Sequence, residues 1–145
     1  MAADLPNPLL ELIIETNRLA RHATRHIADS RSSAQYRVLG TLDNVGPMRI
    51  GDLADYERLS QPGTTKLTLA LEADGLIVRE NDPHDGRVAI VHITEDGRAE
   101  LQKWRSQIAH ALEPLSAALT SEQEAVVRRA ADIIRTQIQK AGNTR

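Results

Sequence analysis

A polar six-residue segment, Asp82-Pro83-His84-Asp85-Gly86-Arg87, separates two short apolar runs of the chain. Leu76-Ile77-Val78 precedes the segment, and Val88-Ala89-Ile90-Val91-His92-Ile93 follows it. Apolar runs rich in β-branched residues that are joined by Pro, Gly and Asp predict a β-hairpin. Such a hairpin, with Arg87 at its tip, has a shape that fits a DNA groove. From there the arginine can enter a minor groove, where narrow A/T-rich tracts concentrate negative potential.

A second polar group lies upstream, at the start of a helix predicted over residues 60–75. Ser60 offers a hydroxyl to cap this helix, and Gly75 is a suitable terminator. We expect an inward stripe formed by Leu67, Ala70 and Leu71. A helix placed directly before such a hairpin is the layout of a winged helix-turn-helix, whose second helix presents its first turns to base edges. The residues in those turns are Gln61, Gly63, Thr64, Thr65 and Lys66.

These side chains have the chemistry that base recognition needs. Glutamine can pair bidentately with adenine, threonine can offer a hydroxyl or a methyl group, and lysine can reach guanine or phosphate. The alternative for Thr64 and Thr65 is an exposed helix turn with no such role. Asp85 is expected to hold the guanidinium of Arg87 in an extended pose, the alternative being a local ion pair on a surface turn. The candidate phosphate contacts are Arg49, Arg58 and Arg79.

Long amphipathic helices are predicted on both sides of this centre. Apolar spacing predicts a helix from Pro8 to about Ala28 and a second helix that follows the break at residues 31–33 and ends at Gly46-Pro47. A strand stub at residues 48–50 and a short helix over residues 51–57 come next. Thr94 is expected to cap a helix that Pro114 kinks or ends, and a last helix starts near Thr120. The expected fold is mainly α with a small β-hairpin wing. It comprises a winged helix-turn-helix over residues 31–104 and a helical dimerisation region over residues 1–30 and 105–145, in one compact domain.

Composition limits the class of protein further. The 145 residues are 41% hydrophobic, 26% charged and only 2% aromatic, so a folded core of Leu, Ile, Val and Ala is expected. The absence of cysteine excludes disulfides, thiolate zinc sites and thiol redox sensing. No membrane span or secretory signal is visible, so a cytoplasmic location is expected. The net charge of −2 argues against indiscriminate nucleic-acid binding, although a basic face on an acidic body remains open.

A spaced series of short motifs then identifies a family resemblance. The series is Leu59-Ser60-Gln61-Pro62, Thr65-Lys66-Leu67, Leu71-Glu72-Ala73-Asp74-Gly75-Leu76-Ile77, Asp82-Pro83-x-Asp85-x-Arg87 and Ile93-Thr94-Glu95-Asp96-Gly97. Nearly the whole chain resembles the MarR (multiple antibiotic resistance regulator) family of winged-helix transcription factors. The resemblance implies a homodimer that binds a near-palindromic operator in double-stranded DNA. It also implies a regulator that often represses and is often released by a small aromatic or lipophilic acid.

Three positions depart from this family pattern. Gly63 stands where relatives often have a bulkier residue, which weakens the helix but lets its backbone approach DNA closely. Leu69 and Ala70 occupy positions that are often polar, so base contacts are expected mainly from the first turns of the helix, and Arg87 is expected to carry much of the affinity. The resemblance also implies an effector pocket, for which the lining candidates are Tyr36, Trp104 and His22. Core packing is the alternative for Tyr36 and Trp104.

Other chemistry is not expected. His22 and His26 have a metal-like spacing of four residues, but three neighbouring arginines would repel a cation and no further ligand completes the set. A basic helical stripe that helps to bind an anionic effector is the other interpretation. No nucleophilic triad or glycine-rich phosphate loop is visible, so we expect neither an enzyme nor a cofactor. The alternative function is a helical interaction dimer of the same fold with little DNA affinity.

Overall fold

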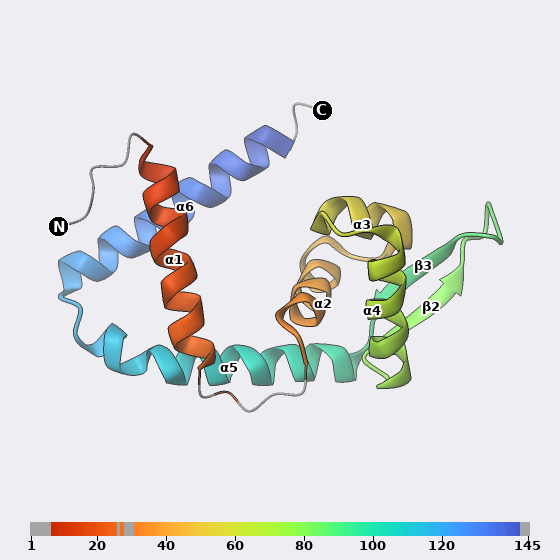
Figure 1. Ribbon diagram of the computed structural model, residues 1–145, viewed down its shortest axis with the longest axis horizontal. Helices are drawn as coiled ribbons and strands as arrows, with labels where there is room; N and C mark the ends of the chain where they lie inside the picture. Colours follow the sequence, from red (N-terminus) through yellow and green to blue (C-terminus); the bar gives the residue numbers. More distant parts are fainter. Residues whose placement is uncertain (1–6, 26, 28–30, 143–145) are drawn as a thin grey trace. The chain divides into compact units, whose positions relative to one another are not determined.

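The computed structural model describes residues 7–25, 27 and 31–142. Six helices and three strands follow one another along this part of the chain (Figure 1). They are α1 (Pro8–Thr24), α2 (Ser33–Val45), β1 (Met48–Arg49), α3 (Ile50–Glu57), α4 (Gln61–Ala73), β2 (Ile77–Asn81), β3 (Ala89–Ile93), α5 (Glu95–Ala117) and α6 (Ser121–Gly142). The prediction of a mainly α fold with a small β-hairpin wing is confirmed.

Internal contacts divide the chain into two compact units. The central unit comprises residues 26–108, and the terminal unit comprises residues 1–25 together with residues 109–145. Helix α5 begins in the central unit and ends in the terminal one. Within the described part of the chain, no helix is both long enough and apolar enough to span a membrane.

Side-chain caps fix the starts of several helices. The Ser32 hydroxyl accepts from the backbone of Gln35 at 3.3 Å while the Gln35 side chain accepts from the Ser32 backbone at 2.9 Å, which satisfies two otherwise unpaired amides. Thr120 and Gln123 form the same reciprocal pair before α6. The Ser60 hydroxyl accepts from the Gly63 amide at 3.1 Å, as predicted. These caps explain why the breaks between helices fall where they do.

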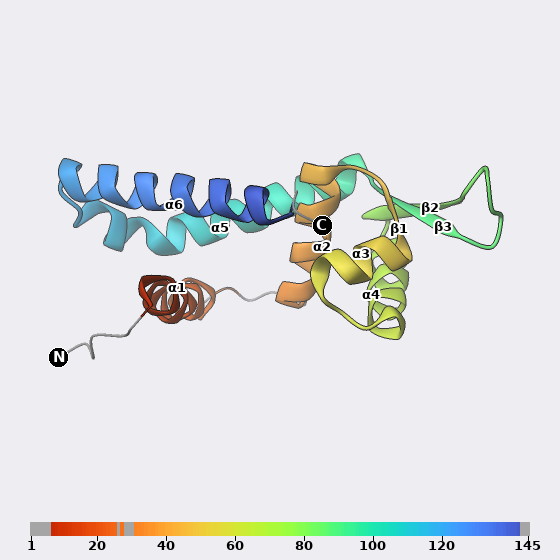
Figure 2. The same ribbon diagram turned by 90° about the horizontal axis from the view of Figure 1, so that it is seen from above.

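A three-stranded antiparallel sheet closes one side of the central unit. Strand β3 lies in the middle, with the two-residue β1 on one side and β2 on the other. Val91 and Ile93 alternate inward along β3, and Ile77 is buried opposite Ile93. Beyond the strands, the tip of the hairpin projects away from helices α2, α3 and α4 in both views (Figures 1 and 2).

Two glycines are required where the hairpin meets its flanking helices. Gly75 ends α4 with φ +73°, a left-handed conformation that glycine adopts without strain. Gly97 lies in the first turn of α5, where its amide donates to the Thr94 hydroxyl at 3.0 Å. A Cβ atom at Gly97 would come within 2.1 Å of the Leu76 carbonyl oxygen. The backbone of α5 can therefore approach the start of β2 only because this residue has no side chain.

One apolar cluster forms the core of the central unit. Every helix and strand of the unit except β1 contributes fully buried residues to it, and Met48, Ile50 and Trp104 pack against it. Its buried members are Tyr36, Val38, Leu39, Leu42, Leu53, Leu71, Leu76, Ile77, Val91, Ile93 and Leu101. This core fixes α3, α4 and the base of the hairpin as one body, which is what positions the candidate site.

Helix α1 ends earlier than predicted, and helix α5 ends later than one of its two predictions allowed. Helix α1 ends at Thr24, and Ile27 lies outside it; the predicted end at Ala28 lies outside the described residues. Helix α5 continues through Pro114 to Ala117, so the proline does not end it, and the predicted kink stays a prediction. Proline removes one amide donor, to the carbonyl of His110, and His110 is exposed so that water can replace the donor. The helix therefore tolerates the loss.

Candidate nucleic-acid interface

Helix α4 has a buried face made mostly of threonine rather than of the predicted aliphatic stripe. Thr64 and Thr68 are 0% exposed, whereas Ala70 is exposed and Leu67 is half-buried; only Leu71 of the predicted stripe is fully buried. The Thr64 hydroxyl donates to the Ser60 carbonyl at 3.0 Å, and the Thr68 hydroxyl donates to the Thr65 carbonyl at 3.0 Å. Because local backbone carbonyls accept both hydroxyl protons, the two threonines can be buried without an unsatisfied donor.

This orientation overturns one predicted DNA contact. Thr64 cannot reach a base edge, because its side chain is fully buried against the core of the central unit. The exposed-turn alternative for Thr64 is wrong for the same reason. The amide of Gly63 is already occupied by the Ser60 cap, and a Cβ at this position would lie 2.9 Å from the Ser60 hydroxyl oxygen. Gly63 thus has a local role in the cap.

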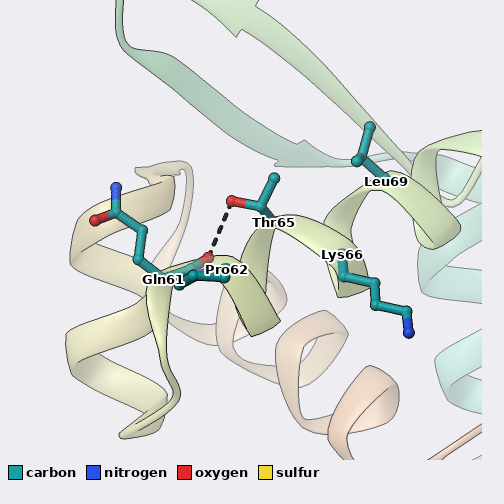
Figure 3. Close-up of a pocket in the computed structure, with 5 residues that line it drawn as sticks. All are labelled: Gln61, Pro62, Thr65, Lys66 and Leu69. Atoms are coloured by element: carbon teal, nitrogen blue, oxygen red, sulfur yellow. Dashed lines mark hydrogen bonds between the residues drawn. The ribbon is translucent and has the colours of Figure 1, made fainter.

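The outward side of α4 carries the other predicted base-reading residues. Gln61, Thr65 and Lys66 line a shallow groove of about 530 Å³ together with Pro62 and Leu69 (Figure 3). The Thr65 hydroxyl donates to the Gln61 carbonyl at 3.0 Å. The structure therefore brings three of the five residues predicted at the start of this helix onto one accessible surface.

The wing turn is held by hydrogen bonds between its own residues. The Asp82 amide donates to the Val88 carbonyl at 2.8 Å, and the Val88 amide donates to the Asp85 carbonyl at 2.9 Å. The Asp85 carboxylate accepts from the backbone amide of Arg87 at 3.1 Å. Asp85 was expected to hold the guanidinium of Arg87, but its bond in the structure goes to the backbone. It shapes the turn, and the Arg87 side chain stays exposed.

The burial of one carboxylate at the base of the wing is not predicted by the sequence pattern. Asp82 is 4% exposed, accepts from the His84 amide at 2.8 Å and forms an ion pair with Arg49 of β1 at 2.6 Å. The His84 amide holds the pKa of Asp82 below its ordinary value, and Arg49 lowers this pKa further. The Asp-Pro-x-Asp turn was the available signal, since aspartate often bonds the backbone two residues ahead.

The candidate cations of the central unit fall into two groups. Arg49 pairs with Asp82, and Arg79 pairs with Glu72 at 2.7 Å. Lys66, Arg87 and Arg58 are exposed, and within the described part of the chain they form no ion pair. Arg58 adopts a left-handed conformation, with φ 53°, at the end of α3. The second group can therefore meet an anion without first breaking an existing pair.

The three effector-pocket candidates lie in different surroundings. Tyr36 is 2% exposed, stacks on Trp104 with ring centroids 4.6 Å apart, and donates to Glu100 at 3.2 Å. Tyr36 is a core residue, which agrees with the core-packing alternative, and its role in an effector pocket stays a prediction. Trp104 is half-buried against the same core. His22 belongs to the terminal unit, where it lines a shallow basic groove with Arg18, Arg21 and Arg25.

The structure does not test the metal-like spacing of His22 and His26. His26 lies outside the described residues, and no group of three or more His, Asp or Glu suited to a metal ion occurs among residues 7–25, 27 and 31–142.

Known proteins match both the sequence and the fold. The model of the MarR family matches residues 32–89. An uncharacterized HTH-type transcriptional regulator of Mycobacterium leprae is 32% identical over 125 residues, which are 86% of this chain and 87% of the relative. The homoprotocatechuate degradative operon repressor of Escherichia coli is 28% identical over 89 residues, covering 61% of this chain and 60% of the relative.

A solved structure extends the likeness to the whole fold. Wild-type apo MarR from Escherichia coli matches with a TM-score of 0.72 at 20% identity, over 90% of this chain and 98% of that chain. Helix α4 and the hairpin thus occupy the positions of the recognition (reading) helix and the wing in a DNA-binding winged-helix fold. The chain belongs to the MarR family of HTH-type transcriptional regulators.

Proposed function

We propose that the protein is a homodimeric, sequence-specific repressor that binds a near-palindromic operator and is released by a small aromatic or lipophilic acid. Helix α4 lies in the major groove, and the wing places Arg87 in the neighbouring minor groove. The observation that carries this proposal is the position of the unpaired cations: Lys66 on α4, Arg58 just before it and Arg87 on the wing tip. Unpaired cations on one reading unit attract phosphate in spite of a net charge of −2.

The residues of the interface divide by role. Gln61, Thr65 and Lys66 read base edges from the exposed face of α4. Arg58 contacts phosphate, and Asp85 shapes the turn that presents Arg87. Arg49 and Arg79 are weaker phosphate candidates, because their guanidinium groups are paired with Asp82 and Glu72, respectively, by ion pairs.

An apolar groove in the terminal unit supports the homodimer. It has a volume of about 950 Å³ and is lined from α1 and α6, mainly by aliphatic side chains. Those side chains include Leu9, Leu12, Ile13, Val127, Ile134 and Ile138. A second copy of the chain, related by a two-fold axis, would bury this surface and would place two reading units on the two halves of a palindromic site.

The effector proposal rests on two supports. The relative named above is a repressor of an operon that degrades homoprotocatechuate. The groove at His22 carries Arg21 and Arg25, which suit a carboxylate, whereas Arg18 there pairs with Glu15 at 2.8 Å. An effector releases DNA only if it binds the free and DNA-bound conformations with different affinity. Titration with aromatic acids should therefore weaken DNA binding and raise thermal stability. If neither property changes, the proposed effector class is wrong.

The regulator itself is tested by retardation of the DNA upstream of its own gene at two salt concentrations. A DNA-binding regulator retards this fragment more strongly than a scrambled duplex, and its affinity falls as salt rises. Absence of retardation at the lower salt concentration would instead support an interaction dimer that has kept the fold without DNA affinity.

A further inference from the structure

The exposed face of α4 carries an apolar strip, formed by Thr65 and Leu69, next to the polar Gln61. Gln61, Thr65 and Leu69 are four residues apart, so they lie on one side of the helix. Figure 3 shows all three side chains projecting toward that side, whereas Lys66 extends away from it. This side differs from the buried face formed by Thr64, Thr68 and Leu71.

The accessible surface of this strip is more apolar than its residue types indicate. The Thr65 hydroxyl donates its proton to the Gln61 carbonyl at 3.0 Å, and Figure 3 shows its methyl group on the same side as Leu69. Leu69 is 47% exposed, and Pro62, which lines the same groove, is also exposed. The middle of the groove thus offers methyl and methylene groups, and the amide of Gln61 and the ammonium of Lys66 lie at its edges.

Charge determines which partner fits this strip. The exposed cation Lys66 lines the same groove, so its occupant has to combine an apolar surface with a polyanion. A DNA major groove combines both where it contains thymine, because thymine alone among the four bases presents a methyl group there. An apolar protein partner would give no reason for the cation.

We propose that Thr65 and Leu69 select operators by packing against the C5-methyl groups of thymines in each half-site. Leu69 is then a specificity-determining residue, although the sequence pattern alone indicated a loss of contacts at this position. The inference rests on the proposed function and adds to it the class of base that α4 reads.

The test replaces methyl groups without changing base pairing. A duplex is first recovered from a random-sequence library by binding to the full-length protein, and each thymine in it is then replaced singly by deoxyuridine. Loss of one buried methyl contact should weaken binding about fourfold at the thymines that face α4. In Leu69→Ala, the penalty at one of those positions should disappear, because the partner of that methyl group is gone.

A matched leucine separates this effect from general damage. Leu119 is 40% exposed in the turn before α6, and Leu119→Ala should keep every uracil penalty of the wild-type protein. If wild-type protein binds the recovered duplex specifically but is indifferent to uracil throughout it, the methyl-reading inference is overturned while the proposed function stands. If no duplex is recovered with specificity, the proposed function falls together with this inference.

Discussion

The two units of the chain differ in the burial of their apolar side chains: the central unit encloses them, and the terminal unit leaves many of them exposed. The central unit encloses an eleven-residue cluster that draws on its helices and on β2 and β3. In the terminal unit, Ala23 is the one buried residue of α1, and α6 has none. Large aliphatic side chains of both helices are exposed instead, including Leu9, Leu10, Ile13, Ile14, Val126, Val127, Ile133 and Ile138.

This difference indicates what each unit needs in order to be stable. Burial of apolar surface is the main favourable contribution to folding, so the central unit can hold its reading helix and wing within one copy of the chain. Two helices with an exposed apolar groove gain the same contribution only from a partner of complementary shape. In the proposed homodimer, a second copy would provide such a surface and would also match the symmetry of a palindromic DNA site.

The largest expected effect comes from the core of the central unit. Leu53 is 0% exposed, so Leu53→Ala should lower the free energy of unfolding by about 2–5 kcal/mol. Leu69→Ala, an equal truncation at an exposed position of the same unit, should change it by less than about 0.5 kcal/mol. Chemical denaturation measures both, and equal losses in the two variants would contradict a self-sufficient core.

The next effect comes from the groove of the terminal unit. Ile138 is 67% exposed in a single chain, so Ile138→Glu should leave the fold intact but place a charge in the contact between copies. We expect the dimer to dissociate and operator affinity to fall about a hundredfold or more, because the two reading units no longer bind together. Sedimentation and DNA retardation measure these two effects.

Val126→Glu is the control for this substitution. Val126 lies on the same helix and is 63% exposed, but it does not line the groove. The Val126 variant should sediment as a dimer. Dissociation of both variants, or of neither, would show that this groove is not the contact surface.

A smaller effect is expected at the base of the wing. The Arg49–Asp82 ion pair connects β1 to the hairpin. Arg49→Met and Asp82→Asn should each weaken DNA binding a few-fold, which is the effect expected from the loss of a single hydrogen-bonded charge pair. The double variant should be no weaker than either single one, since both remove the same contact. If Arg49 binds phosphate instead, only Arg49→Met should weaken binding and lower the salt dependence.

The smallest effect is a pH dependence of stability. Because the folded-state pKa of Asp82 is lowered, its ionised form stabilises the fold above the ordinary aspartate pKa. That contribution disappears as pH falls through the lower folded-state pKa. Asp82→Asn should therefore flatten the acid limb of a plot of melting temperature against pH. An acid limb identical to that of the wild-type protein would contradict a structural role for this carboxylate.

Much of the fold could be predicted from local signals. The caps at Ser60 and Thr94, the terminator Gly75 and the turn residues of the wing have local physical causes, and the structure confirms them. Helix ends without such a cap were less predictable. The end of α1 and the passage of α5 through Pro114 depend on surroundings that spacing does not record.

The orientation of the reading helix could not be predicted in the same way. Hydrophobicity alone favours Leu67 and Ala70 as inward residues, but the core takes Thr64 and Thr68, whose hydroxyls are satisfied by their own backbone. The same limitation hid the burial of Asp82, because its partner Arg49 is distant in the sequence. Both errors arise where polar groups pair locally or across the fold, which periodicity does not detect.

The most direct measurement compares the loss of one arginine from each unit. Arg87→Ala removes the wing cation, and Arg128→Ala removes the same charge from α6, where Arg128 pairs with its neighbour Glu124. If the central unit alone contacts DNA, Arg87→Ala should lower affinity about tenfold for recovered and scrambled duplexes alike and reduce the slope of log affinity against log salt by about 1. Arg128→Ala should change neither quantity. Wild-type affinity in Arg87→Ala at matched salt, or equal losses in the two variants, would contradict the assignment of DNA binding to the wing and its unit.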